Sequence, residues 1–240
     1  MHDRSRDIHA AFHRRRCSRR IITATAVMGV VFFLFSCAAI TLYTIDMTYS
    51  PSHEPPRPAT RLSDDITFTV AQFTDTRDID DKAVVGKVID ASGKIIRVMP
   101  KYAPPADIVA SGIRTYLTGI GYTVSDKSPV WNSESEPMDR DWGTVLVGGT
   151  IDKLSIICHK EVVKKRYEAH VKLSVFFASV EEARIFHRVS VETNPSLVHV
   201  QFSEDRLAEQ INTALADAIE RVMSKETVYQ AISENVGKSN

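Results

Sequence analysis

A basic start followed by a long uncharged run decides which compartment this chain can fold in. The first twenty residues hold seven Arg and two Asp, and residues 21–45 form an uncharged run of 25 residues. A basic segment that leads into an apolar run is typical of a bacterial export signal. Within the run, Leu34-Phe35-Ser36-Cys37 is typical of a lipobox, in which a peptidase cleaves after Ser36 and the thiol of Cys37 receives a diacylglyceryl group. We therefore predict a signal peptide over residues 1–36 and a lipidated, palmitate-bearing Cys37.

The same uncharged run is also long enough to form an uncleaved transmembrane helix. Its 25 residues would measure about 37 Å as a helix, and the hydrocarbon core of a bilayer is about 30 Å thick. The polar residues Thr41 and Thr44 and the alternation over residues 40–48 favour a strand after Cys37, and so favour lipidation. The bulky Phe35 favours the signal anchor. Either anchor leaves the rest of the chain outside the cytoplasm, because Arg-rich flanks stay inside.

The chain after the cleavage point divides into a tether and one domain. Four prolines fall within residues 50–62, and proline removes backbone donors and favours an extended polyproline conformation. We predict a tether over residues 37–62. The alternative is that this proline-rich segment lies along the domain surface. Residues 63–240 are enough for one domain with its own hydrophobic core.

The charge and cysteine content exclude two classes of protein. Without its basic start, the chain carries 23 Lys and Arg against 28 Asp and Glu. A mildly acidic protein is a poor candidate for nucleic-acid binding, which requires a clustered basic face, so we predict no nucleic-acid partner. If the signal is removed and Cys37 is lipidated, Cys158 is the one thiol left in the folded part, and no intramolecular disulfide can form. The apolar neighbours of Cys158 predict a buried, structural cysteine.

Alternating and helical patterns predict an α+β domain. Strands are expected at residues 65–73, 84–89, 94–98 and 122–125, and a three-stranded antiparallel meander at 145–151, 167–178 and 185–192. A helix is expected over 105–119, where Pro105 suits the first turn and an apolar stripe recurs. A second helix is expected to begin after Ser203, a good N-cap, and a short third helix to follow over 225–234. We predict a largely antiparallel sheet with the two main helices packed on one face.

No pattern in the chain predicts catalysis, a cofactor or a metal centre. The acidic residues after Asp75 lack the spacing of a calcium loop, and we expect local hydrogen bonds between Asp75 and Arg77. The histidines of the mature part show none of the spacings of a zinc site. Gly148-Gly149 and Gly119-x-Gly121 stand in the wrong places for a phosphate-binding turn. We therefore predict a protein that is not an enzyme and has no cofactor.

Two surface features are candidate partner contacts. A basic cluster at an expected hairpin turn contains Lys164, Lys165 and Arg166, and such a patch suits anionic lipid headgroups or an acidic partner. Both tryptophans, Trp131 and Trp142, lie in one loop, where aromatic side chains often anchor an interface. The alternatives are a plain solvated turn for the first and a loop that covers one end of the core for the second.

The order of elements resembles the YajG-type bacterial lipoproteins over roughly residues 64–236. The resemblance is carried by the strand end at Phe73-Thr74-Asp75-Thr76-Arg77, by Gly119-Ile120-Gly121-Tyr122 after the first helix, and by the final helix from Arg206-Leu207-Ala208. It implies an exported lipoprotein without established enzymatic activity on the periplasmic side of the outer membrane. Ala38 agrees with this, since an Asp there would be the usual retention signal.

We predict a membrane-tethered envelope lipoprotein whose domain binds or scaffolds other components, with its oligomeric state open. The alternatives are an auxiliary subunit of an envelope transport or assembly complex, and a signal-anchored envelope protein.

Overall fold

The computed structural model describes residues 42–51, 58–60, 62–131 and 138–236. Its framework is a ten-stranded mixed sheet built around the long strand β7 (Val145–Lys160). One edge of β7 pairs over its full length with β8 (Lys165–Ser179), antiparallel. The other edge pairs in turn with three short parallel strands, β2 (Thr67–Val70), β3 (Thr74–Asp75) and β4 (Gly86–Ile89).

The remaining strands extend this framework on both sides. Antiparallel to β8 lie β9 (Arg184–Thr193) and β10 (Ser196–His199). Next to β4 lies β5 (Ile95–Pro100), and β1 (Leu42–Ile45) is parallel to β5 at the sheet edge. The two-residue β6 (Thr123–Val124) pairs with β2. The predicted meander and the β4–β5 hairpin are confirmed, whereas β10 was not predicted.

The meander forms because its sequence separates a buried face from a wet face. In β8, every second side chain from Tyr167 to Phe177 is buried, and the side chains between them are partly exposed. Strict alternation of this kind places all apolar side chains on one face of a strand. The longest pairs are antiparallel and the short pairs around β7 are mostly parallel, so the predicted α+β class is confirmed with a mixed sheet.

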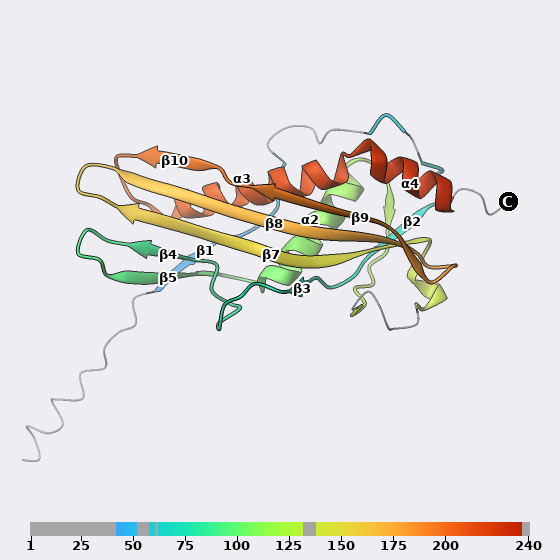
Figure 1. Ribbon diagram of the computed structural model, residues 1–240, viewed down its shortest axis with the longest axis horizontal. Helices are drawn as coiled ribbons and strands as arrows, with labels where there is room; N and C mark the ends of the chain where they lie inside the picture. The colour runs from blue at the N-terminus through green and yellow to red at the C-terminus, as the bar shows by residue number, and fades with distance from the viewer. Residues whose placement is uncertain (1–41, 52–57, 61, 132–137, 237–240) are drawn as a thin grey trace, which may run out of the picture. The chain divides into compact units, whose positions relative to one another are not determined.

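The helices of the described residues lie on one face of the sheet (Figure 1). They are α2 (Pro105–Gly119), α3 (Glu204–Met223) and α4 (Glu226–Val236), and a single 3₁₀ turn, η1 (Arg140–Trp142), precedes β7. The bounds predicted for α2 are confirmed, with Pro105 in its first turn. The predicted N-cap of α3 is also confirmed, because the Ser203 hydroxyl accepts a hydrogen bond from the amide of Arg206 at 3.2 Å.

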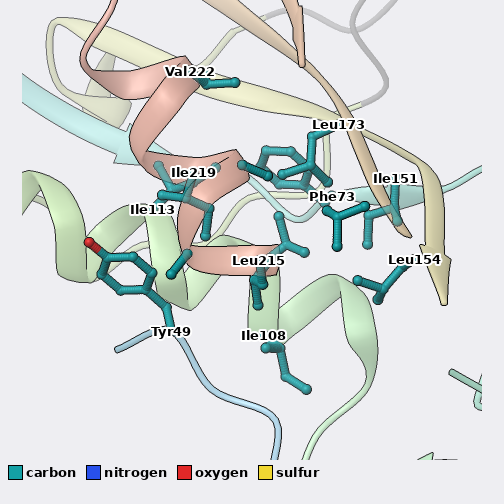
Figure 2. Close-up of a cluster of buried hydrophobic side chains, with 14 of the residues drawn as sticks. Tyr49, Phe73, Ile108, Ile113, Ile151, Leu154, Leu173, Leu215, Ile219 and Val222 are labelled. Carbon is teal, nitrogen blue, oxygen red and sulfur yellow. The ribbon is translucent and has the colours of Figure 1, made fainter. Parts of the chain in front are cut away.

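The main core lies between these helices and the sheet (Figure 2). Leu215 and Ile219 from α3 and Ile113 from α2 are buried together. They meet Leu154 of β7 and Leu173 of β8, which point toward the helices from the sheet. The buried stripe of α3 explains its position, since a helix with one apolar face is stable only where that face is covered.

The domain begins earlier than residue 63. The strand β1 is a full member of the sheet, and the side chains of Met47 and Tyr49 that follow it are buried in the main core. The predicted tether over 37–62 is therefore interrupted by structure from Leu42 on. Residues 52–57 lie outside the described part. Beyond them, the carboxylate of Glu226 accepts hydrogen bonds from the amides of Ala59 and Thr60, so this end of the proline-rich segment lies on the domain surface.

Candidate interaction surface

The turn between β7 and β8 projects an unusual mixture of basic and apolar side chains. We call residues 160–166 the tip. Val162 and Val163 are 87% and 80% exposed, which is rare for valine. Four basic residues accompany them and one acidic residue, Glu161, opposes them; the basic residues are Lys160, Lys164, Lys165 and Arg166. The three partner-contact residues predicted here, Lys164, Lys165 and Arg166, therefore lie together at one end of the molecule.

The ion pairs at the tip leave it with net positive charge. The Glu161 carboxylate is shared by Arg166 at 3.1 Å and Lys164 at 3.8 Å. Arg166 also lies 3.6 Å from Glu168 in β8. All these side chains are substantially exposed, and exposed pairs contribute little because water screens them. The tip therefore presents a positive field and two uncovered valines.

The tip lies at the end of the domain where the described chain begins. The ammonium of Lys160 donates a hydrogen bond to the Tyr43 hydroxyl at 2.9 Å and lies 3.3 Å from the centre of the Phe202 ring. The rings of Tyr43 and Phe202 are 5.1 Å apart. Lysine over aromatic faces is a stabilising arrangement. It joins β1, the tip and the chain after β10 into one structure.

Further exposed apolar side chains surround the tip. Val198 in β10 pairs with Arg166 and is 57% exposed, and Val200 just beyond it is 69% exposed. Sequence reasoning singled out the basic residues of this region and missed the valines. The signal was present in Glu161-Val162-Val163-Lys164, because a turn normally contains Gly, Asn, Asp or Pro, and this one contains none of them.

A buried ion pair holds the loop between β3 and β4. The guanidinium of Arg77 is 4% exposed and pairs with the Asp75 carboxylate. It also donates to the carbonyls of Lys82 at 2.6 Å, Val84 at 2.8 Å and Leu154 at 3.1 Å. Burial alone would raise the pKa of Asp75, but the hydrogen bonds and charge of Arg77 outweigh it and lower that pKa. The predicted local bonds between Asp75 and Arg77 are confirmed, and their role is structural.

A groove of about 430 Å³ lies beside this ion pair, lined by side chains of the same loop, β4, β5 and β7. Ile79 and Ile95 are its most exposed apolar residues, at 39% and 60%. Its walls carry charges of both signs, and no described acidic, histidine or cysteine residues gather there as metal ligands. The groove is therefore a surface hollow in which the described residues form no metal site.

The two tryptophans differ in their surroundings. Trp131 is 4% exposed and packs with Ala71, Leu146 and Ala178 in a small second core, on the sheet face away from the helices. Gly148 makes room for it, because a Cβ at that position would stand 2.7 Å from the indole ring. Trp142 is half-buried at the edge of this cluster. Of the two alternatives for this loop, covering part of the core therefore applies to Trp131. Trp142 remains partly exposed.

The remaining residues that the sequence singled out are three: Ser36, Cys37 and Cys158. Ser36 and Cys37 lie outside the described residues. Cys158 is buried, and burial raises the pKa of its thiol to about 11. Within the described ranges, no three His, Cys, Asp or Glu side chains gather as a metal site. Among the helices described, none has both the length and the apolar character that a membrane span needs.

Comparisons with known proteins identify the fold. No family model matches the chain, and no curated protein matches it. Solved structures do match. A Xanthomonas campestris protein of family DUF330 has a TM-score of 0.50 at 10% identity, and the alignment covers 81% of this chain and 99% of that one.

Two further matches are weaker. The PelC dodecamer from Paraburkholderia phytofirmans has a TM-score of 0.40 at 10% identity, covering 69% of this chain and 91% of that one. A candidate lipoprotein from Caulobacter crescentus has a TM-score of 0.30 at 6% identity, covering 63% and 92%. At such identities the likeness shows a shared fold alone. The resemblance to the YajG-type family therefore stays a hypothesis.

Proposed function

We propose that this chain is an exported bacterial lipoprotein, anchored through Cys37, whose domain binds or scaffolds other components of the cell envelope and is not an enzyme. The observation that carries the proposal is the position of Cys37. It ends the apolar part of an export-type signal and stands five residues before Leu42, the first residue of β1. A lipid on that thiol would fix the domain directly beside a membrane.

The position of β1 favours the lipid anchor over the transmembrane anchor. Residues 42–45 pair with β5 in the sheet, so the uncharged run outside the strand is 21–41, or 21 residues. As a helix this run would measure about 31 Å, close to the thickness of the hydrocarbon core. A membrane helix would then have to end at the residue where the sheet begins, without a connecting segment. A lipidated Cys37 retains four residues of spacer before β1.

The assignment to the periplasmic side of the outer membrane rests on the sequence. Ala38 following the cysteine supports sorting to the outer membrane, and the resemblance to the YajG-type lipoproteins supports a domain that faces the periplasm. The described surface supports binding over chemistry, because its distinctive feature is the exposed tip.

Mass spectrometry of the N-terminus tests the anchor. The mature protein is expected to begin at Cys37 and to carry a diacylglyceryl group, and the variant Cys37→Ser should lose both the lipid and cleavage at residue 37. Cys17→Ser is the matched control, since it removes a cysteine from the predicted signal peptide and should change neither result. Recovery of an intact chain that begins at Met1 in membranes would contradict the proposal and establish the signal anchor.

A further inference from the structure

We propose that the tip is a second membrane contact, which lies on the surface of a bilayer containing anionic phospholipid. The inference deepens the proposed function and rests on it, because it assumes an anchor just before β1. It assigns to the tip a ligand of stated chemistry, the phosphate-bearing headgroup layer. It also fixes the orientation of the domain on the membrane.

The register of the sheet places the tip and the start of β1, which the proposed anchor precedes by five residues, at the same end. Leu42 pairs with Arg97, Arg97 with Lys87, and Lys87 with Ile157. The four residues therefore form one row across the sheet. Strand β1 is parallel to β5, β4 is antiparallel to β5, and β7 is parallel to β4. The N-terminal end of β1 therefore faces the same end of the sheet as the C-terminal end of β7, which leads to the tip (Figure 1).

The two segments that extend beyond this row, one to the tip and one to Cys37, have similar lengths. From Ile157 to Val162 there are five residues, which project up to about 16 Å in extended conformation. From Leu42 back to Cys37 there are also five residues, which reach at most about 17 Å. A lipid on Cys37 can therefore enter the membrane at the level that the exposed valines reach. A shorter spacer would press the tip deeper into the bilayer, or tilt the domain.

The chemistry of the tip suits the headgroup layer. Lys164, Lys165 and Arg166 attract anionic phosphates, and Val162 and Val163 can enter the boundary between headgroups and acyl chains. The diacylglyceryl group on Cys37 would supply two acyl chains, which are enough for stable anchoring, so the basic patch would orient the domain on the bilayer and would not be needed to hold it there. Removing the basic side chains should therefore weaken the charge-dependent part of the contact, and removing the valines should weaken the part that depends on apolar burial.

The orientation follows from the length of the sheet. Strand β7 has 16 residues, which span about 50 Å. The loop that carries Trp131 packs on Gly148 near the start of β7, at the far end from the tip. In this orientation the far end stands about 50 Å from the bilayer, where the half-exposed Trp142 is accessible to an envelope partner.

The test places a fluorescent probe at each end of the lipidated full-length product. Processing removes Cys17, lipid occupies Cys37 and Cys158 is buried, so an introduced cysteine is the one reactive thiol. Val163→Cys carries an environment-sensitive dye at the tip, and Val130→Cys, 68% exposed at the far end, is the matched control. The protein is reconstituted in vesicles of phosphatidylethanolamine and phosphatidylglycerol, with quencher groups on a fraction of the lipids, or in phosphatidylcholine alone.

The expected result is quenching of the dye at residue 163 in the anionic vesicles, and none at residue 130. Lys164→Gln with Lys165→Gln should lower the ratio of docked to undocked protein roughly 30-fold, since each basic residue at an anionic surface contributes about fivefold. Lys127→Gln with Arg140→Gln removes the same charge at the far end and should leave the ratio unchanged. High salt should reverse the docking.

Three outcomes would overturn the inference. The first is a dye at residue 163 that stays unquenched in anionic vesicles, and the second is equal quenching at residues 163 and 130. The third is a change in the emission of the dye at residue 163 that occurs only when an acidic protein is added. Mass spectrometry of the same sample separates the two proposals. If Cys37 carries lipid and the tip stays unquenched, the tip assignment alone fails. If Cys37 carries no lipid, the proposed function fails, and the tip assignment fails with it.

Discussion

Replacing Arg77 by methionine should destabilise the domain more than any surface substitution of similar size. Its guanidinium is 4% exposed and bonds the Asp75 carboxylate together with three backbone carbonyls. Methionine keeps roughly the volume of the side chain but removes the guanidinium from the Asp75 carboxylate and from those carbonyls, and leaves Asp75 the hydrogen bond from the backbone amide of residue 77 at 3.1 Å. Breaking one side of a buried ion pair costs about 3–5 kcal/mol. This is a large fraction of the total stability of a domain, which is about 5–15 kcal/mol.

Urea unfolding of the processed protein in mild detergent, followed by tryptophan emission, measures this cost. With a urea dependence of up to about 3 kcal/mol per molar, Arg77→Met should lower the midpoint by about 1–2 M. Arg221→Met is the matched control, because Arg221 pairs with Asp217 at 2.8 Å on an exposed helix face. Its expected cost is about 0.3–0.5 kcal/mol. A loss below about 1 kcal/mol for Arg77→Met would refute the reasoning that this network organises the loop.

The pH dependence gives an independent check on the same pair. The pKa of Asp75 is lower in the folded state than in the unfolded chain, where it is about 3.9. The pair therefore stabilises the fold fully above the unfolded pKa, and this contribution is lost as the pH falls through the folded pKa. The stability difference between the wild type and Asp75→Asn should be largest near neutral pH and shrink below about pH 4. A difference that grows on acidification would contradict the assignment.

Three further predictions concern packing, capping and thiol reactivity. Trp131→Ala should cost about 3 kcal/mol or more in urea unfolding, because it empties the second core, and a cost near zero would mean that the loop is dispensable. Ser203→Ala should cost about 1 kcal/mol through loss of the α3 cap, while Ser203→Asp should retain stability, and equal losses in both variants would argue against capping. Cys158 should resist maleimide in the native protein and react once urea unfolds it, since its thiol is buried with a pKa of about 11; rapid native labelling at neutral pH would refute its burial.

Elements with a strong local signal could be predicted from the sequence. The helix α2 follows from Pro105 and a repeating apolar stripe, and Ser203 marks the start of α3 by a bond within one helical turn. The meander follows from side-chain alternation within each strand. In contrast, β10 has four residues with a weak pattern, and its pairing with β8 depends on partners about thirty residues earlier in the chain. Local patterns carry no information about such a partner.

The two tryptophans show the same limit at the level of a site. Sequence reasoning placed both in one loop and left open whether they cover the core or contact a partner. Their separation into a buried Trp131 and a half-exposed Trp142 depends on the space above Gly148. That space exists because the glycine lies opposite the loop in the folded sheet. Similarly, the exposure of Val162 and Val163 depends on the tertiary structure, in which no described segment covers their turn.

The sequence by itself determined the main helices and the basic character of residues 160–166, and it is the whole basis for predicting the export-type signal and the lipid site at Cys37. These features depend on composition, spacing and periodicity over a few turns or strands. The tertiary structure alone decided that β1 joins the sheet beside β5, more than fifty residues later in the chain, and that the start of β1 and the tip lie at one end of the sheet. The physical reason is that strand pairing and register are set by contacts between distant segments, which bury a common face and which no local pattern encodes.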